Sequence, residues 1–395
     1  MVTYDFDTLY PRLGVGAGKW QPLEQSGRRS SPDVFPFSVA DMDFKTAPEI
    51  QKALHDAADF AIYGYFSPTD AYKQAICDWQ MRRHGFECKP EWIVQVPNIV
   101  AALYQLVRTF TNPGDGVIIQ PPVYAPFFHA VERQNRRLIL NPLIREQTRY
   151  VMDLNDLEAK AADPDARLMI LCNPHNPVGR VFTREELEAV ARICQAHHLL
   201  LVCDEIHADL VFEPYRHTVI ASLDDETAAN SIICSSPSKT FNLAGLSNAN
   251  LIIPSETLRA RYQSAEEQTG FHCNNYFGTV ACQAAYEKGE NWYQALMHYL
   301  SGNRAMLADT LRKERPEFLM NEIEGTYLGW VDMRSLGLKE KERRQWLSEA
   351  ELYFVSGELF GPGGEGFERI NIALPRRALK AGLDRLIGAV RKGAC

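Results

Sequence analysis

The chain lacks the features of a membrane, secreted or nucleic-acid-binding protein. Its apolar runs stay short of the about 18 residues that a membrane helix needs. The start, MVTYDFDTLYPR, has no cationic region followed by an apolar stretch, so we expect no secretory signal. A net charge of −8 is not the basic excess that is typical of nucleic-acid binding. We therefore expect a cytoplasmic protein that has no membrane or nucleic-acid partner.

Motifs of several enzyme classes are also missing. The nine cysteines include no CxxC pair, and Cys172, Cys203 and Cys234 lie inside apolar runs. This arrangement is typical of buried, reduced thiols rather than of disulfide bonds or a zinc site. Neither HExxH nor GxSxG occurs, and RLGVGAGKW (12–20) fails as a phosphate loop because Leu13 stands at its first glycine position. We expect no metal in the site.

The chain does contain enough apolar sequence for a large core. It has 395 residues, of which 46% are hydrophobic, and this length favours two domains. Residues 1–45 are irregular, strand-like and helix-like segments alternate over 46–285, and long helix signals follow. We predict a large domain at 46–285, a small C-terminal domain at 286–395, and an N-terminal arm at 1–45 that packs with the small domain.

The middle of the chain carries the pattern of an α/β fold. Short, continuous apolar runs such as RLMILC (167–172) suit strands that are covered on both faces. Between two of them, TREELEAVARICQAHH (183–198) begins with Thr183 and has Glu186 three residues later, a helix capping box. This alternation predicts a mostly parallel sheet flanked by helices. The predicted strands are 92–96, 116–120, 137–141, 167–172, 199–203, 231–234 and 249–253.

Polar segments follow three of these predicted strands. NPHNPVGR (173–180), DEIHADL (204–210) and SSPSKTFNLAG (235–245) each come directly after an apolar run. Ligands of open α/β sheets bind outside the carboxyl ends of the strands. If the strands are neighbours, an amide, a carboxylate and an amine converge at one edge of the sheet.

This combination fits pyridoxal 5′-phosphate. A lysine amine, here Lys239, can form a Schiff base with the aldehyde of this cofactor. A carboxylate, here Asp204, can keep the pyridine nitrogen protonated, and an amide can hydrogen-bond the phenolic oxygen. The phosphate needs small hydroxyls and helix N–H groups. Ser236, Ser238 and the start of the predicted helix 98–110 offer them.

Each of these residues also has an ordinary structural interpretation. A lysine in a serine-rich turn is usually solvated, and an isolated aspartate after a strand usually caps a helix. NPxNP is turn chemistry in any protein, and His207 is more often a core histidine than a catalyst. The hypothesis therefore depends on the occurrence of the three groups together, each at a strand end.

Taken together, the motifs resemble fold-type I pyridoxal-phosphate enzymes, the aspartate aminotransferase superfamily. The lysine motif S-x-S-K is matched at 236–239, and N-P-x-G at 176–179. Within the superfamily the chain is most similar to the cystathionine β-lyase-like MalY/PatB branch of C–S lyases. The matching segments are ADMDF (40–44), YGY (63–65), PPVYAPF (121–127), DEIHADL (204–210), SKTFNLAGL (238–246) and FERINIALPR (367–376).

The resemblance implies roles around the cofactor ring. Lys239 would carry the cofactor and Asp204 would pair with the pyridinium nitrogen. Asn176 and His207 would lie near the phenolic oxygen, and Tyr124 would stack on the ring. Lys239, Asp204 and Tyr124 are the implied catalytic residues.

The resemblance also implies a phosphate site, a substrate site and a dimer. The implied phosphate ligands are Ser236, Ser238 and the backbone of Ile99 and Val100. Tyr65 would reach the phosphate in the neighbouring subunit, which implies a homodimer with shared active sites. Arg369 would bind the α-carboxylate of a small amino-acid substrate, since a guanidinium matches a carboxylate with two parallel hydrogen bonds.

The expected activity is β-elimination of a thiol from cystathionine or a cysteine S-conjugate, giving pyruvate and ammonia. Ala125 stands where C–S lyases often have a second tyrosine, and Asn98 where this branch usually has a small residue. FNLAGLSNAN lacks the phosphate-binding arginine of many aminotransferases. An aminotransferase that shares the same cofactor residues stays the alternative, followed by a regulatory protein that binds the cofactor. The expected fold is the fold-type I transferase fold, with a large, mostly parallel sheet domain and a smaller α+β domain.

Overall fold

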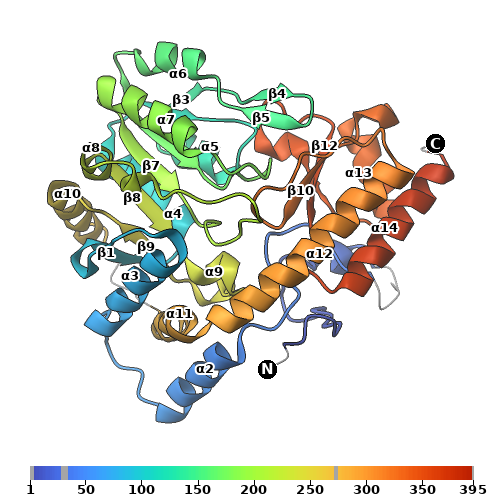
Figure 1. Ribbon diagram of the computed structural model, residues 1–395, viewed down its shortest axis with the longest axis horizontal. Coiled ribbons are helices and arrows are strands. Elements are labelled where there is room, and N and C mark those ends of the chain that lie inside the picture. The colour runs from blue at the N-terminus through green and yellow to red at the C-terminus, as the bar shows by residue number, and fades with distance from the viewer. Residues whose placement is uncertain (1–3, 28–33, 271–274, 394–395) are drawn as a thin grey trace.

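The computed structural model describes residues 4–27, 34–270 and 275–393. Its centre is a seven-stranded sheet in the order β1-β9-β8-β7-β6-β2-β3 (Figure 1). β9 is antiparallel to both of its neighbours, and the other adjacent strands run parallel. The predicted mostly parallel α/β sheet is confirmed. The strands are β1 (Ile93–Val96), β2 (Gly116–Ile119), β3 (Arg137–Leu140), β6 (Ala166–Cys172), β7 (Leu200–Asp204), β8 (Ser231–Ser235) and β9 (Ala249–Ile252).

All seven predicted apolar runs are strands of this sheet, with shifts of about one residue at their ends. β7 reaches one residue beyond its apolar run, because Asp204 still pairs with Cys172 of β6. Every residue of β7 and β8 is buried. Strands pair through backbone hydrogen bonds, which do not require an apolar side chain. A polar residue can therefore end a buried strand.

Different helices cover the two faces of the sheet. Alternate strand residues pack into separate apolar clusters, with Ile170 and Val202 in one and Leu171 and Cys203 in the other. α4 (Ile99–Phe110), α5 (Pro126–Glu132) and α10 (Glu256–Glu267) contribute to the first cluster. The second takes side chains from α2 (Pro48–Phe60), α3 (Asp70–His84), α6 (Leu154–Ala161), α7 (Arg184–Ala196) and α11 (Tyr276–Lys288). The predicted capping box of α7 is present, with Thr183 and Glu186 bonded reciprocally.

The C-terminal part is built on a second, antiparallel sheet. Its strand order is β10-β12-β11, and α12 and α14 lie side by side next to it (Figure 1). The elements are α12 (Glu290–Glu314), β10 (Leu328–Asp332), α13 (Glu340–Glu349), β11 (Val355–Ser356), β12 (Phe367–Asn371) and α14 (Arg376–Arg391). The remaining short α-helices and strands are α1 (Gln21–Gln25), β4 (Ile144–Glu146), β5 (Arg149–Val151), α8 (Asp225–Ala229) and α9 (Pro237–Thr240).

The long helix predicted to start at residue 286 differs from the observed helices in one respect. Residues 286–288 close α11, and α12 begins at Glu290 after Gly289. A Cβ at Gly289 would lie 2.4 Å from Cε1 of Phe241, so the break accommodates a ring that is distant in sequence. The predicted boundary at 285/286 falls inside α11. The division into three parts stays a prediction.

The segment around residues 37–44 connects the two sheets. The Phe37 N–H donates to the carbonyl of Tyr353, and the Asn371 side chain of β12 donates to the carbonyls of Val39 and Asp41. From the other side, Asn242 donates to the carbonyls of Met42 and Phe44. This segment is therefore fixed between β12 and the turn after α9.

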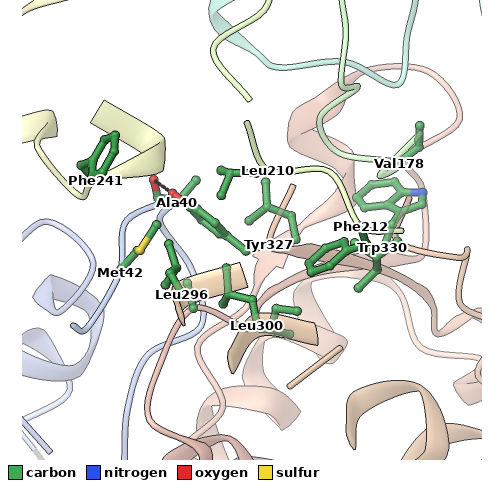
Figure 2. Close-up of a cluster of buried hydrophobic side chains, with 14 of the residues drawn as sticks. Ala40, Met42, Val178, Leu210, Phe212, Phe241, Leu296, Leu300, Tyr327 and Trp330 are labelled. Carbon is green, nitrogen blue, oxygen red and sulfur yellow. Dashed lines mark hydrogen bonds between the residues drawn. The ribbon is translucent and has the colours of Figure 1, made fainter. Parts of the chain in front are cut away.

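Figure 2 shows the apolar cluster beneath this segment. Ala40 and Met42 lie beside Leu296 and Leu300 of α12, and Tyr327 points toward Ala40. These side chains come from segments that are far apart in sequence. In the described parts of the chain, no helix combines the length and the apolarity that crossing a membrane requires.

Candidate active site

A cavity of about 470 Å³ opens at the carboxyl ends of β6, β7 and β8. These strands are neighbours in the sheet, so the three predicted polar segments do meet. Ten of the predicted site residues line the cavity: Ile99, Val100, Tyr124, Asn176, Asp204, His207, Ser236, Ser238, Lys239 and Arg369. Tyr65 does not line it and is fully exposed on this chain.

Lys239 lies on α9, the short helix that follows β8. Its Nζ donates a hydrogen bond of 2.8 Å to the carbonyl oxygen of Ala40. Burial lowers the pKa of Lys239 to about 8, and the charge of Arg369 acts in the same direction, against the charges of Asp41 and Asp204. A lysine with such a pKa carries a useful fraction of neutral amine near neutral pH. The ordinary interpretation of Lys239 as a solvated turn residue therefore does not fit this environment.

Asp204 ends β7 and is buried. Burial raises its pKa to about 7, while the N–H of Ile206, 3.2 Å from Oδ1, and the charge of Lys239 lower it. Among the described residues, no cationic side chain forms an ion pair with this carboxylate. The charged form of a buried carboxyl group without an ion-pair partner would be stabilised by a cation such as a protonated pyridine nitrogen.

Arg369 comes from β12 of the second sheet and is buried. Its Nη1 donates to Asn176 Oδ1 and its Nη2 to the carbonyl of Ser38, each at 3.0 Å. Its Nε has no hydrogen-bond partner among the described residues. Burial lowers its pKa to about 10, which still leaves the guanidinium charged at neutral pH. The side chain is thus held in place with donor capacity to spare for a carboxylate.

Two further polar groups face the cavity in a neutral state. Burial lowers the pKa of His207 well below its usual value, helped by the charges of Lys239 and Arg369. The Nδ1 of His207 has no partner among the described residues. Burial raises the pKa of Tyr124, although Arg369 opposes the shift, so its hydroxyl stays protonated. Both can exchange a hydrogen bond with a ligand.

The N-terminus of α4 also lines the cavity. Asn98 caps this helix, because its Oδ1 accepts the N–H of Ala101 at 2.8 Å. The N–H groups of Ile99 and Val100, in the first turn, have no intrahelical acceptor. This end therefore offers donors and the positive end of a helix dipole to an anion. Asn98, a departure from the branch pattern, is explained by capping.

The two serines differ in their surroundings. The Ser236 hydroxyl caps α9 by accepting the N–H of Ser238 at 3.1 Å, and it donates to the carbonyl of Asn248 at 2.8 Å. Ser238 is less engaged, since its hydroxyl contacts only that of Ser236, at 2.9 Å, among the described side chains. The two hydroxyls and the α4 N-terminus line the same cavity.

The side chains and the helix N-terminus that line the cavity fit pyridoxal phosphate. The cavity holds a partly buried amine, a buried carboxylate without a fixed cation, an unpartnered imidazole nitrogen and an anion site at a helix N-terminus. The residues that would contact each part of the cofactor stay predictions.

Sequence reasoning missed several cavity residues. Ala40 contributes a backbone carbonyl, which cannot be recognised from residue type, although Ala40 lies in ADMDF (40–44), one of the segments that match the C–S lyase branch. Val355 pairs with Arg369 across β11 and β12, a contact that depends on the second sheet. The other missed residues are Val39, Asn98, Cys172, Ile206, Ala244, Ser247 and Asn248.

Residues 32–386 match the family described as aminotransferase class I and II. The chain belongs to this family. The family of the predicted resemblance is thereby confirmed, together with the fold type that it implied.

Three similar proteins, two of which are named as lyases, match nearly the whole chain. Cystathionine beta-lyase PatB of Bacillus subtilis (strain 168) is 40% identical, over 98% of this chain and 100% of PatB. Cystalysin from Treponema denticola, whose structure contains pyridoxal 5′-phosphate, is 36% identical with a TM-score of 0.96, over 99% and 100% of the two chains. The pyridoxal-phosphate-bound C–S lyase from Staphylococcus hominis is 33% identical with a TM-score of 0.89, over 98% of each chain.

Proposed function

We propose that this chain is a pyridoxal-phosphate-dependent lyase that cleaves the Cβ–S bond of a cysteine-derived amino acid. With one water, the substrate yields a thiol, pyruvate and ammonia. The convergence of Lys239, Asp204 and Arg369 in one cavity carries the proposal. The similarity to PatB, a cystathionine beta-lyase, and to the C–S lyase from Staphylococcus hominis supports C–S cleavage over amine transfer.

The cofactor, when bound, supplies an aldehyde that captures amines and a ring that withdraws electrons from Cα of the amino acid. The Asp204 carboxylate would hold a proton at the ring nitrogen, which would keep that ring electron-poor. Asn176 and His207 would donate toward the phenolic oxygen, and Tyr124 would lie against the ring. Ser236, Ser238 and the N–H groups of Ile99 and Val100 would hold the phosphate.

Arg369 orients the substrate. Its guanidinium is fixed by Asn176 and Ser38, so it can bind the α-carboxylate without ordering a mobile side chain. A fixed carboxylate limits rotation about Cα, and the Cα–H bond can then stand perpendicular to the ring.

Lys239 has two tasks. It holds the cofactor at rest, and its amine, once free, removes the Cα proton as general base. A pKa of about 8 suits both tasks, since the neutral amine is available near neutral pH. Lys239 then holds that proton at Nζ while the thiolate leaves Cβ.

The proposal includes a cytoplasmic homodimer with shared sites. Seven cysteines among the described residues are buried and free, in keeping with a reducing compartment. Phe60, Ile62, Tyr63 and Tyr65 are exposed apolar side chains within six residues of chain. Such a segment favours a subunit contact, and Tyr65 would reach the neighbouring cofactor from it.

The deciding experiment assays purified protein against L-cystathionine, L-cystine and S-methyl-L-cysteine, with and without a keto acid. We expect thiol and pyruvate in equal amounts without the keto acid. Strict dependence on the keto acid would mean transamination instead. Lys239→Ala should lose turnover and the visible absorption of bound cofactor, whereas the exposed Lys52→Ala should retain both. Retention of both properties by Lys239→Ala would contradict the assignment.

A further inference from the structure

The carbonyl oxygen of Ala40 accepts two hydrogen bonds. The Lys239 Nζ donates to it at 2.8 Å, and the Tyr327 hydroxyl donates to it at 3.0 Å. Figure 2 shows the second bond, with the phenol reaching up from the apolar cluster. The amine that performs the proposed chemistry thus shares its acceptor with a tyrosine outside the cavity lining.

Tyr327 is a rigid and permanent donor. It is fully buried beside Leu296 and Leu300, and burial raises the pKa of its hydroxyl well above the usual value, with the charge of Asp41 adding to the shift and that of Arg369 opposing it. The phenol therefore keeps its proton and cannot swing away. Its ring also meets the His207 ring edge-on, with centroids 6.1 Å apart.

The backbone on both sides of Ala40 is fixed as well. The Asn371 Nδ2 donates to the carbonyls of Val39 and Asp41, each at 2.7 Å. The carbonyls on either side of Ala40 are thus turned toward β12, and that of Ala40 is turned toward Lys239 and Tyr327. The acceptor is held in position before any substrate binds.

We propose that the Ala40 carbonyl is the docking point of the Lys239 amine whenever that amine is free, and that Tyr327 is a positioning residue that holds this carbonyl. This inference rests on the proposed role of Lys239. One N–H of the neutral amine bonds to Ala40, which limits the directions in which its lone pair can point. When Nζ takes the Cα proton, the same bond becomes charge-assisted and stronger.

This arrangement favours the transition state over the ground state. Positive charge develops on Nζ as the proton moves, and a fixed carbonyl dipole stabilises that charge without reorganisation. Tyr327 pre-orients the carbonyl. Its loss should slow the proton transfer while substrate binding at Arg369 changes little.

The test is the exchange of the Cα hydrogen of L-alanine in D₂O, followed by NMR with the cofactor-bound enzyme. L-alanine has no leaving group, so exchange reports proton removal alone. We expect Tyr327→Phe to lower the maximal exchange rate about 10- to 100-fold, as small misplacements of reacting groups do. We expect its KM for L-alanine to change less than about 3-fold and its visible cofactor absorption to be retained.

Tyr150→Phe is the matched control. Its hydroxyl is also buried and bonded, since it accepts from the Trp330 indole at 3.1 Å, but Tyr150 lies outside the cavity lining. We expect normal exchange in this variant. If Tyr327→Phe exchanges at the wild-type rate, or if Tyr150→Phe is slowed equally, the proposal is wrong.

Two further measurements separate this proposal from others. Tyr327→Phe removes one hydrogen bond worth about 1 kcal/mol and leaves Ala40 bonded to Lys239, so it should fold. Should it not fold, Asn371→Ser, which releases the carbonyls of Val39 and Asp41, must show the same slowed exchange; a wild-type rate would overturn the proposal. A wild-type enzyme that exchanges L-alanine but releases no pyruvate from sulfur amino acids would refute the lyase and leave this inference intact.

Discussion

At the scale of single residues, the cavity combines buried groups whose charge states are adjusted by burial. Burial disfavours the charged form of both Asp204 and Lys239. The charge of Lys239 partly offsets this effect at Asp204, and the charges of Asp41 and Asp204 partly offset it at Lys239. Residue type alone indicated the chemistry of both groups, because an amine and a carboxylate at strand ends fit one cofactor. Their pKa values could not be predicted from the sequence, since burial depends on elements far away in the chain.

The raised pKa of Asp204 predicts a pH-dependent stability. The folded protein holds a proton at this carboxyl up to about pH 7, whereas an unfolded chain has the ordinary value of 3.8. The stability contribution of the neutral acid is thus complete below that ordinary value and is lost as the pH rises through about 7. Lys239, Glu205 and Cys172 face the same carboxyl group, and the Lys239 charge moderates this loss.

We expect Asp204→Asn to remove this dependence in cofactor-free protein. The free energy of unfolding of the variant, minus that of the wild type, should rise between pH 5 and pH 8, as measured by urea denaturation. A difference that is independent of pH would contradict the buried-acid environment. The same variant with cofactor should turn over more slowly, because Asn cannot hold the ring proton.

At the scale of elements, the strands were predictable because both faces of the sheet are covered and their residues read as continuous apolar runs. The break between α11 and α12 was not predictable, because Gly289 leaves room for the ring of Phe241, which is close to it only after folding. Helix caps were predictable in one case and not in another. The Thr183 box is readable from spacing, whereas Asn98 as the cap of α4 became evident from the structure.

Asn98 predicts a graded series at α4. Asn98→Ala should cost about 1 kcal/mol of stability and Asn98→Gly only a few tenths, since glycine is a tolerated N-cap. Because Asn98 sets the start of the helix that faces the phosphate end, Asn98→Ala should also weaken cofactor binding in an equilibrium titration. Thr183→Ala, which removes the distant cap of α7, should cost similar stability and leave cofactor affinity unchanged. Equal effects of both alanine variants on cofactor affinity would contradict a local role for Asn98.

At the scale of the whole molecule, the site draws on both sheets and on the segment between them. Lys239 and Asp204 come from the large sheet, Arg369 from the second sheet, and Ala40 from the connecting segment. The proposed dimer adds Tyr65 of a neighbouring subunit. Light scattering should accordingly give about twice the chain mass of 44.7 kDa.

Shared sites can be tested by complementation. Tyr65→Ala and Lys239→Ala should each be strongly impaired alone. Mixed after subunit exchange, they should recover about a quarter of wild-type activity, because half of the dimers are mixed and each of these holds one intact site. No recovery, despite exchange verified by mass, would argue against sharing through Tyr65.

The kind of chemistry and the class of fold could be predicted from residue types and their spacing. Apolar runs, a capping box and three polar strand ends each involve residues that are close together in the sequence. Such patterns can therefore be recognised without the structure. The direction in which the Lys239 amine points could not be predicted in this way, because it depends on contacts that form only on folding. Its acceptor is the backbone carbonyl of Ala40, which is fixed by Tyr327 and Asn371, both hundreds of residues away from Ala40 in the sequence. Every residue has a backbone carbonyl, so the residue type does not show which carbonyl will accept a hydrogen bond from Lys239. That role depends on where the fold places the carbonyl.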